Sequence, residues 1–310
     1  MEGFGRIVLR LLQSRNFILP LAVVLSLAVG QTAVWTKPAL LPVLMLIMTV
    51  STASITSKEL AAFKTMARPI LISQLLNYFV LGGVILLAAW LMVDDKELWS
   101  GFVVLAAMPP AIAVTPYSYL LKGNTFFSLI GMVAAYLFAL VITPAVMILF
   151  LGVGFLNPME LLLILLQIII VPLIASRLLR LTKLIHSIDR WRGTFINWCF
   201  FVVVFTIIGL NRQVLFGEVD ALLKISAVVI ISTFVLGHVL QLVAKALHLS
   251  KQTVISWMLM GTLKNYGLAS VIALTLFSEK ASIPSAIGVV FSVLYVVWLG
   301  FYLRERVKSG

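Results

Sequence analysis

A single lysine lies in the middle of a long apolar segment. Lys264 is part of residues 252–277, and Thr262, Asn265 and Tyr266 are the polar side chains nearest to it in the sequence. A lysine at the centre of a membrane-spanning helix costs roughly 2.5–3.5 kcal/mol on insertion scales. A polar environment must offset that cost, so we predict a functional role for Lys264.

A second interruption lies in residues 99–121. Pro109, Pro110 and Pro116 lie too close together for one continuous helix, because each lacks an amide hydrogen and its ring clashes with the preceding turn. Lipid cannot satisfy the freed backbone groups, so they must line a cavity that holds ions, water or substrate. The alternative is a passive bundle with ordinary proline kinks. The residues that we predict to line a substrate cavity are Pro109, Pro110, Tyr117, Thr262 and Tyr266.

Other reactive side chains form no recognisable site. Cys199 lies in an apolar run, and the three histidines share no metal-ligand spacing. No Asp or Glu falls in the middle of an apolar segment, so we expect neither a metal site nor a proton relay through carboxylates. Ser128 and Lys264 would suit an intramembrane hydrolase, with the serine as nucleophile and the lysine as base. Nothing else in the sequence supports that alternative.

Composition predicts an integral membrane protein. Of the 310 residues, 62% are hydrophobic and 11% are charged, whereas soluble domains carry about 25% charged residues. This excludes a soluble enzyme, a nucleic-acid-binding domain and a disordered chain. The net charge of +12 is distributed between apolar runs, which is typical of charges that orient a membrane protein. The expected surroundings are therefore a lipid bilayer, and nucleic acid is not an expected partner.

Ten apolar segments approach the roughly 20 residues that a helix needs to cross the hydrocarbon. Most Lys and Arg residues lie on the side of both termini, so we expect both termini in the cytoplasm and a multi-pass protein of the cell (inner) membrane. The basic residues expected on the opposite side are Lys37, Lys96, Arg212, Lys224 and Lys280. The predicted spans are residues 17–35, 39–56, 69–92, 99–121, 125–152, 158–176, 194–211, 222–244, 252–277 and 283–303.

The two interruptions occupy corresponding places. Each lies in the fourth span of a five-span half, the first half being residues 1–156 and the second residues 157–310. Because each half has an odd number of spans, the two halves must be inverted relative to each other. Paired interrupted helices in an inverted repeat indicate a transporter whose binding site lies near the bilayer midplane.

Short motifs follow both interruptions. The first set comprises residues 115–124, Ser128 and residues 143–145; the second comprises residues 265–269, Pro284 and residues 288–292. In order and spacing, the two sets resemble helices four, five, nine and ten of the bile acid:sodium symporter family. The resemblance extends over nearly the whole chain.

The resemblance implies an all-α membrane protein of ten helices. Spans 3–5 and 8–10 would form a core domain in which helices 4 and 9 cross, and spans 1, 2, 6 and 7 would form a panel. Substrate would bind between core and panel, and rocking would give alternating access. The family's substrates are mostly organic anions, from bile acid and steroid conjugates to carboxylates such as pantothenate or pyruvate. The partner implied for this chain is therefore a small organic anion.

The chain departs from the family at the sodium ligands. The resemblance places Met260 and Lys264 where the family has a Glu and a Gln, and Val114-Thr115 where it has a Ser-Asn pair. Sodium prefers hard oxygen ligands. We therefore expect no coupling to Na⁺ in the family's manner, and no other cofactor.

The remaining family ligands are partly kept. Ser128 matches one of two fifth-helix hydroxyls, while Met132 replaces the other, and Asn77 lies near the position of a third-helix Gln. The predicted ion-site region therefore comprises Lys264, Thr115, Ser128, Asn265, Met260 and Asn77.

Four roles are open for Lys264. Its ammonium could replace the missing sodium as a tethered cation, held by the carbonyl ends of broken helices 4 and 9. It could carry H⁺, or it could pair with an anionic substrate. It could also reach a water-filled vestibule and have a structural role only.

The sequence thus predicts a secondary active or facilitative transporter of a small organic anion that works by alternating access and is sodium-independent. Two alternatives from the same fold are a Na⁺-coupled symporter with a rearranged site and a non-transporting membrane receptor or scaffold. A channel is disfavoured, because crossed broken helices suit alternating access better than a continuous pore.

Overall fold

The computed structural model describes residues 11–53, 66–152, 158–182 and 184–308. The described residues are almost entirely helical, as predicted, and their single β-type pairing is an isolated bridge between Pro110 and Lys264. Within these residues, seven helical segments are long and apolar enough to cross a membrane: Phe17–Thr52, Ala67–Met92, Thr125–Leu151, Met159–Leu181, Trp191–Leu210, Val219–Ala246 and Lys280–Leu303.

Seven segments are fewer than the ten predicted spans, and the difference has two sources. The 36-residue segment 17–52 contains the first predicted span and the second as far as residue 52. The predicted spans at residues 99–121 and 252–277 are each divided between two helices that are too short to be counted.

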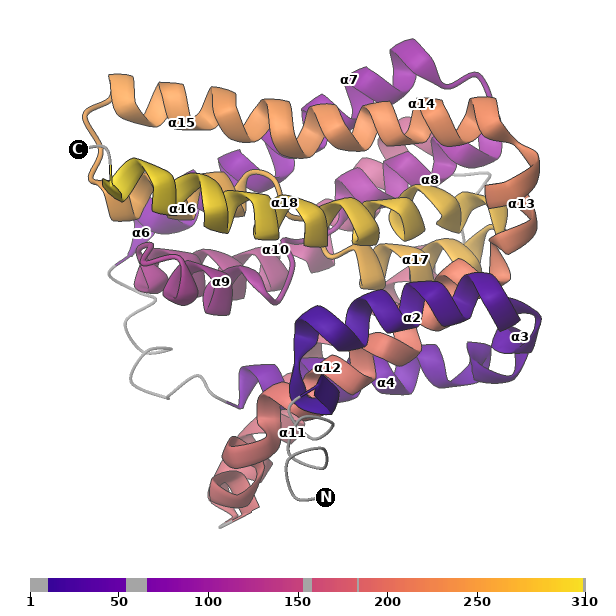
Figure 1. Ribbon diagram of the computed structural model, residues 1–310, viewed down its shortest axis with the longest axis horizontal. Helices are drawn as coiled ribbons and strands as arrows, with labels where there is room; N and C mark the ends of the chain where they lie inside the picture. Colours follow the sequence, from indigo (N-terminus) through magenta and orange to yellow (C-terminus); the bar gives the residue numbers. More distant parts are fainter. Residues whose placement is uncertain (1–10, 54–65, 153–157, 183, 309–310) are drawn as a thin grey trace. The chain divides into compact units, whose positions relative to one another are not determined.

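The chain divides into two compact units. Unit 1 comprises residues 1–56 and 163–217, and unit 2 comprises residues 57–162 and 218–310. In unit 1, α2 (Arg15–Val29) turns through η1 (Gly30–Thr32), α3 (Ala33–Thr36) and η2 (Lys37–Ala39) into α4 (Leu40–Thr52), which runs back in the opposite direction (Figure 1). The unit also contains most of α11 (Pro158–Leu181), together with α12 (Leu184–Leu210) and α13 (Arg212–Gly217).

Helix α12 packs against both α2 and α4. A Cβ atom on Gly30 would lie 2.8 Å from the Cα atom of Gly209, so the absence of side chains lets the two backbones approach closely. The hydroxyl groups of Thr36 and Thr206 share a hydrogen bond of 2.6 Å beside this contact. Small residues and a polar pair therefore join the helices of unit 1.

Unit 2 contains the same order of elements twice. A long helix with a central π-helical segment comes first: α6 (Ala67–Gln74), η4 (Leu75–Leu81) and α7 (Gly82–Met92), and later α14 (Val219–Ile230), η6 (Ile231–Val235) and α15 (Leu236–Ala246). Two short helices follow: α8 (Lys96–Ala107) and α9 (Val114–Leu120), and later α16 (Lys251–Met260) and α17 (Tyr266–Leu276). Each series ends in a long helix, α10 (Thr125–Leu151) or η7 (Lys280–Ser282) with α18 (Ile283–Lys308).

Polar side chains mark the starts of four helices in unit 2. The side chains of Asp95, Asn124, Ser250 and Asn265 accept hydrogen bonds from the first backbone amides of α8, α10, α16 and α17. Such caps satisfy amides that have no partner inside the helix. They explain why α10 and α17 begin directly after the connections that hold Asn124 and Asn265.

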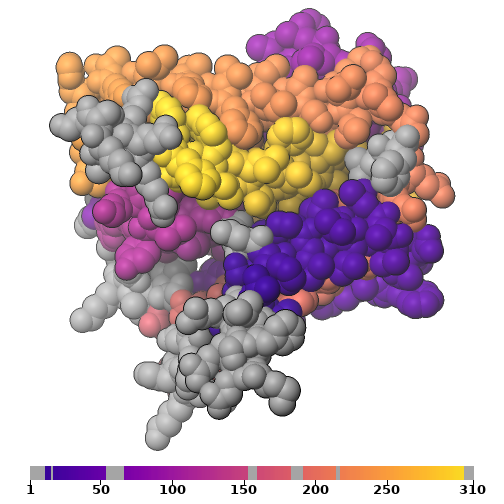
Figure 2. All heavy atoms as spheres, in the orientation of Figure 1, coloured from indigo at the N-terminus to yellow at the C-terminus, as the bar shows by residue number. Residues whose placement is uncertain are grey.

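Helices α15 and α18 of unit 2 expose large apolar side chains. The two helices lie side by side (Figure 2), joined by a hydrogen bond of 2.9 Å from the Tyr302 hydroxyl to Gln241 Oε1. Leu242 on α15 is 66% exposed and Phe301 on α18 is 62% exposed. Exposed apolar side chains of this kind suit contact with lipid.

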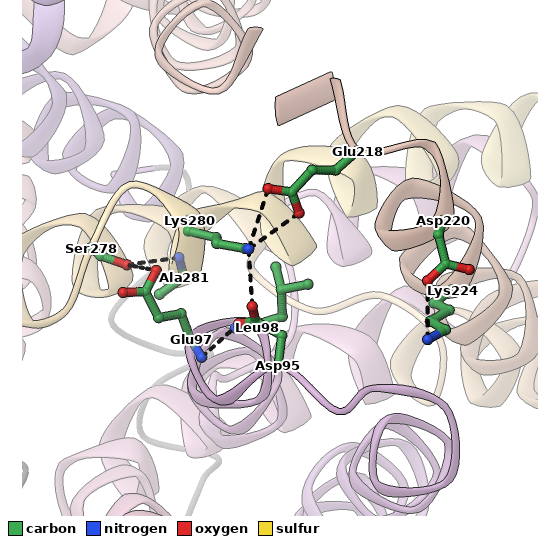
Figure 3. A network of polar contacts seen from close by, with 9 residues as sticks. All are labelled: Asp95, Glu97, Leu98, Glu218, Asp220, Lys224, Ser278, Lys280 and Ala281. Carbon is green, nitrogen blue, oxygen red and sulfur yellow. Dashed lines mark hydrogen bonds and ion pairs between the residues drawn. The ribbon is translucent and has the colours of Figure 1, made fainter. Parts of the chain in front are cut away.

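An ion-pair network joins three connections of unit 2 (Figure 3). Lys280 Nζ lies 2.9 Å from Asp95 Oδ2 and 3.2 Å from Glu218 Oε2. Ser278 Oγ donates to Glu97 Oε2 at 3.1 Å. The start of α8 is thereby tied to the residue before α14 and to the connection between α17 and η7.

The pKa of Asp95 is lowered from its ordinary value. Burial acts to raise this pKa, but hydrogen bonds from the backbone amides of Leu98 and Glu97 and the ammonium of Lys280 lower it by more. A carboxylate whose folded-state pKa is depressed stabilises the fold above its ordinary pKa, and this contribution is lost as the pH falls through the lowered value.

We predict that Asp95→Asn, which keeps an N-cap but removes the charge, lowers the melting temperature at pH 7 by about 2–4 °C. The partly exposed ion pair contributes at most about 1 kcal/mol. The melting temperatures of wild type and variant should begin to converge as the pH falls below the ordinary carboxyl pKa of about 4, and should coincide only below the lowered pKa of Asp95, as thermal unfolding in detergent would show. Asp94→Asn is the control, since that carboxylate is 96% exposed. A difference that stays constant with pH would contradict the assignment.

Candidate functional site

The connections that follow α8 and α16 pair with each other. The Ala111 amide donates to the Leu263 carbonyl at 3.0 Å, and the Asn265 amide donates to the Pro109 carbonyl at 2.9 Å. These two bonds form the antiparallel bridge centred on Pro110 and Lys264. Each connection therefore satisfies backbone groups of the other, which neither could do inside a helix.

The helices around this bridge pack in an exchanged order. Helix α8 contacts α17, and α9 contacts α16, so the first helix of each pair lies against the second helix of the other. Met108 ends α8 in an extended conformation (φ −73°, ψ 150°), as expected for the residue before a proline.

The Lys264 ammonium lies in a cage of four oxygen atoms. Lys264 is fully buried, and its Nζ donates to the Asn77 carbonyl at 2.9 Å, Asn77 Oδ1 at 3.0 Å, the Ala106 carbonyl at 2.8 Å and the Met108 carbonyl at 2.8 Å. The ring centroid of Tyr78 is 4.9 Å from Nζ, within the range of a cation–π contact.

Two kinds of helix irregularity supply these oxygens. Ala106 lies in the last turn of α8 and Met108 directly follows the helix, where carbonyl groups lack partners within the helix and the helix dipole favours a cation. Asn77 lies in the π-helix η4, and its side-chain amide also donates to the Met260 carbonyl at 3.5 Å. The carbonyl end of α8 was expected to hold the ammonium, and this is confirmed. The carbonyl end of α16 was expected as well, and this part is wrong, because Asn77 in η4 contributes instead.

The cage suits a charged lysine. An ammonium group has three N–H donors and no lone pair, whereas a neutral amine would turn its lone pair toward one of the surrounding oxygens. Four acceptors at 2.8–3.0 Å therefore favour the charged form.

A second network joins both connections through Tyr136 on α10. The Tyr136 hydroxyl donates to the Pro110 carbonyl at 3.2 Å and accepts a hydrogen bond from Asn265 Nδ2 at 2.7 Å. Asn265 Oδ1 accepts from the Leu268 amide at 3.0 Å, which caps α17. Tyr136 thus fixes the side chain that starts α17.

The other residues of the predicted ion-site region lie outside this cage. Thr115 Oγ1 points to the sulfur atom of Met132 at 3.7 Å, a weak acceptor. Ser128 Oγ is buried and makes no hydrogen bond in the described structure. The Lys264 ammonium is bonded to other oxygens, so the serine–lysine pair of a hydrolase is not assembled.

The predicted cavity residues are all buried: Pro109, Pro110, Tyr117, Thr262 and Tyr266. Thr262 lies in the connection after α16, and its Oγ1 donates to the Met258 carbonyl near the end of that helix at 2.6 Å. The Tyr266 ring lies against Gly288, where a Cβ atom would approach Tyr266 Cε1. Their contact with a substrate stays a prediction.

Sequence reasoning missed four members of the site. Tyr78 and Tyr136 are tyrosines in apolar segments, and no spacing marked them as neighbours of Lys264. Ala106 and Met108 lie at the carbonyl end of α8, which was predicted as a partner, but the two residues were not named because they act through backbone carbonyl groups. The one available signal was the need of a buried ammonium for several acceptors.

Metal ligation has little support in the described residues. They contain no group of three or more His, Cys, Asp or Glu side chains that could hold a metal ion. The carbonyl oxygens of Asn77, Ala106 and Met108, which could otherwise face a metal ion, accept hydrogen bonds from Lys264 Nζ.

Comparison with known sequences gives one match. Residues 41–218 match the Sodium Bile acid symporter family. None of the curated proteins compared with the chain matches it. The matched range contains Asn77, Ala106 and Met108 but not Lys264.

We predict that Lys264→Met lowers the melting temperature in detergent by at least about 6 °C. The thioether is similar in length but leaves several buried carbonyl groups without a donor, each costing about 1–3 kcal/mol. Thr262→Val is the matched control, because it removes one hydrogen bond, from the connection after α16 to the Met258 carbonyl of that helix, and should lower the melting temperature by about 2–4 °C. Equal stability of Lys264→Met and wild type would show that the cage does not hold the two connections together.

Proposed function

Because the chain belongs to the Sodium Bile acid symporter family, we propose that it is a sodium-independent carrier of a small organic anion in which the Lys264 ammonium is a fixed cation. Family membership and the long apolar helices indicate a multi-pass membrane transporter. The observation that carries the finer proposal is the position of Lys264 Nζ among four oxygens.

We further propose ten spans in two inverted halves, residues 1–156 and 157–310. The turn through α3 supports two spans within residues 17–52. The pairs α8–α9 and α16–α17 would each form one discontinuous span. The antiparallel bridge between their connections and the π-helix in the preceding helix of each half support the inversion.

Unit 1 would then be the panel and unit 2 the core. Each unit is compact on its own, and an alternating-access carrier needs parts that keep their internal packing while they move. The network of Lys264, Asn77 and Tyr136 lies wholly within unit 2, so it would move with the core as one body.

Lys264 supports sodium independence on electrostatic grounds. A sodium ion in this cage would have to share its oxygens with an ammonium, and two like charges a few ångströms apart repel strongly in a low dielectric. Met260, at the end of α16, adds a thioether rather than an anionic oxygen. The tethered cation would satisfy the same carbonyl groups permanently.

The same geometry disfavours two other roles for Lys264. A substrate anion would find the ammonium fully buried and already bonded to protein oxygens. Proton transport through Lys264 would require a neutral amine among four acceptors, which the cage destabilises. We therefore propose facilitated transport or exchange, with the anion recognised by groups other than Lys264.

Flux in proteoliposomes tests this proposal. Radiolabelled taurocholate, pantothenate and pyruvate would be offered separately, in NaCl or choline chloride of equal concentration, with protein-free liposomes as the control. We expect saturable uptake of at least one anion, at rates that agree within about twofold between the two salts and are unaffected by an imposed pH gradient. Uptake that requires Na⁺ would contradict sodium independence, and uptake of none of the three would contradict the proposed substrate class.

A further inference from the structure

Ion pairs gather at the point where the chain passes from unit 1 into unit 2 (Figure 3). The boundary between the units falls between Gly217, the last residue of α13, and Glu218. Gly217 is exposed, and a Cβ atom placed on it would contact nothing within 4 Å. Helix α14 begins with the residue after Glu218. The chain thus leaves a position without side-chain packing and enters unit 2 at a single acidic residue.

The side chain of Glu218 does not serve the helix that it precedes. The backbone of Glu218 is not helical (φ −113°, ψ 72°), and its side chain accepts no hydrogen bond from the first amides of α14, although the residue before a helix commonly does so. Instead, both carboxylate oxygens lie near Lys280 Nζ, at 3.2 Å and 3.4 Å. The carboxylate therefore ties the start of α14 to the connection between α17 and η7.

Lys280 is itself held firmly. Its Nζ lies 2.9 Å from Asp95 Oδ2, and the other oxygen of Asp95 accepts hydrogen bonds from the first backbone amides of α8. Helix α8 and η7 also approach closely, since a Cβ atom on Gly101 would collide with the Ala281 carbonyl. The Lys280 side chain is 26% exposed. One partly buried ammonium thus joins three connections of unit 2.

Unit 2 contains a corresponding tie that has no such acidic residue. Ser256 Oγ donates to the Asn124 carbonyl at 3.0 Å, which joins α16 to the connection after α9, much as Lys280 joins the start of α8 to the connection after α17. In that half, the residue before the long helix α6 is Met66, which packs against apolar side chains. A tie between the helix pairs therefore does not require a carboxylate at this position, and this indicates a separate purpose for Glu218.

We propose that the network of Glu218, Lys280 and Asp95 is an anchor that fixes the entry of the chain into unit 2, so that bending between the units is confined to residues 211–217. Domains that move as rigid bodies bend at a few residues near the ends of elements, and a fixed end determines where that bending occurs. Single exposed ion pairs contribute little, but a network around one lysine retains more of its effect. The purpose of the anchor rests on the proposed alternating access, whereas the anchor can be measured without transport.

Hydrogen exchange of the full chain in detergent, measured by mass spectrometry, tests the anchor without any substrate. In wild type we expect the amides of residues 222–226 to exchange at least about tenfold more slowly than those of residues 212–217. Glu218→Gln keeps the size of the side chain and removes its charge, so it should speed exchange at residues 222–226 about threefold to fivefold. Lys280→Gln should have at least the same effect, and adding Glu218→Gln to it should cause no further increase.

Asp220→Asn is the matched control. It removes one carboxylate charge from the first turn of α14, where any acidic residue stabilises a helix, but Asp220 pairs with Lys224 rather than with Lys280. Its effect should be less than about half of that of Glu218→Gln and should persist in the Lys280→Gln background. Equal effects of Glu218→Gln and Asp220→Asn would show a general charge effect at the helix start and overturn the anchor. Equal exchange on the two sides of residue 218 in wild type would overturn it as well.

Transport tests the purpose of the anchor separately. With any anion whose uptake by wild type is saturable, Glu218→Gln should lower the maximal rate at least about twofold and leave the half-saturating concentration unchanged, because the anchor acts on movement and not on the anion. An unchanged maximal rate would contradict the role in movement. Absence of uptake in wild type would contradict the proposed function, whereas the exchange measurements would still decide whether the anchor exists.

Discussion

Backbone groups freed from helices have no partner in lipid, and unit 2 depends on how this constraint is met. The connections after α8 and α16 exchange two backbone hydrogen bonds. The Lys264 ammonium then satisfies carbonyl groups that the bridge leaves over, at Ala106, Met108 and Asn77. Without that donor, several carbonyl groups would be buried and unpaired, at a cost of about 1–3 kcal/mol each.

A fixed cation has consequences that a mobile one does not. A mobile ion can leave, so its binding energy can be coupled to a gradient and to a conformational change. An ammonium on a lysine side chain stays with the core in every state. Its interactions therefore cannot couple an ion gradient to the conformational change. The resemblance to sodium-coupled carriers and the proposed loss of sodium coupling are therefore compatible, because a tethered ammonium would hold oxygens of the core together without an ion that leaves.

Hydropathy and residue type predicted much of the fold and part of the site. The apolar segments, the interruption by Pro109 and Pro110 and the odd position of Lys264 were visible because each violates the rules of a continuous membrane helix. The two π-helices were not, since no residue pattern specifies where a helix takes the wider turn. Tyr136 was missed for a related reason. Its role depends on which helices pack together, and its neighbours in the sequence are ordinary apolar residues.

The residues that the resemblance assigned to one ion-site region do not all lie together in the structure. Lys264 and Asn77 are bonded to each other, whereas Thr115 contacts Met132 and Ser128 Oγ makes no hydrogen bond in the described residues. A resemblance assigns each ion ligand to one position of the chain separately. Whether those side chains form one site depends on how all of them are placed together. Met132 and Met260 lie where the resemblance has oxygen-bearing side chains, so fewer oxygen ligands are left to bring the remaining hydroxyl groups to one ion.

Sodium dependence of stability tests the central claim most directly, since it requires no knowledge of the substrate. The purified protein would be unfolded thermally in increasing NaCl and, at equal ionic strength, in choline chloride. An ion that binds only the folded state at one hundred times its dissociation constant would stabilise it by about 2.7 kcal/mol. We predict that wild type responds equally to the two salts. A saturable rise specific to sodium would show that the ion binds despite Lys264, and would contradict the proposal that the ammonium has taken its place.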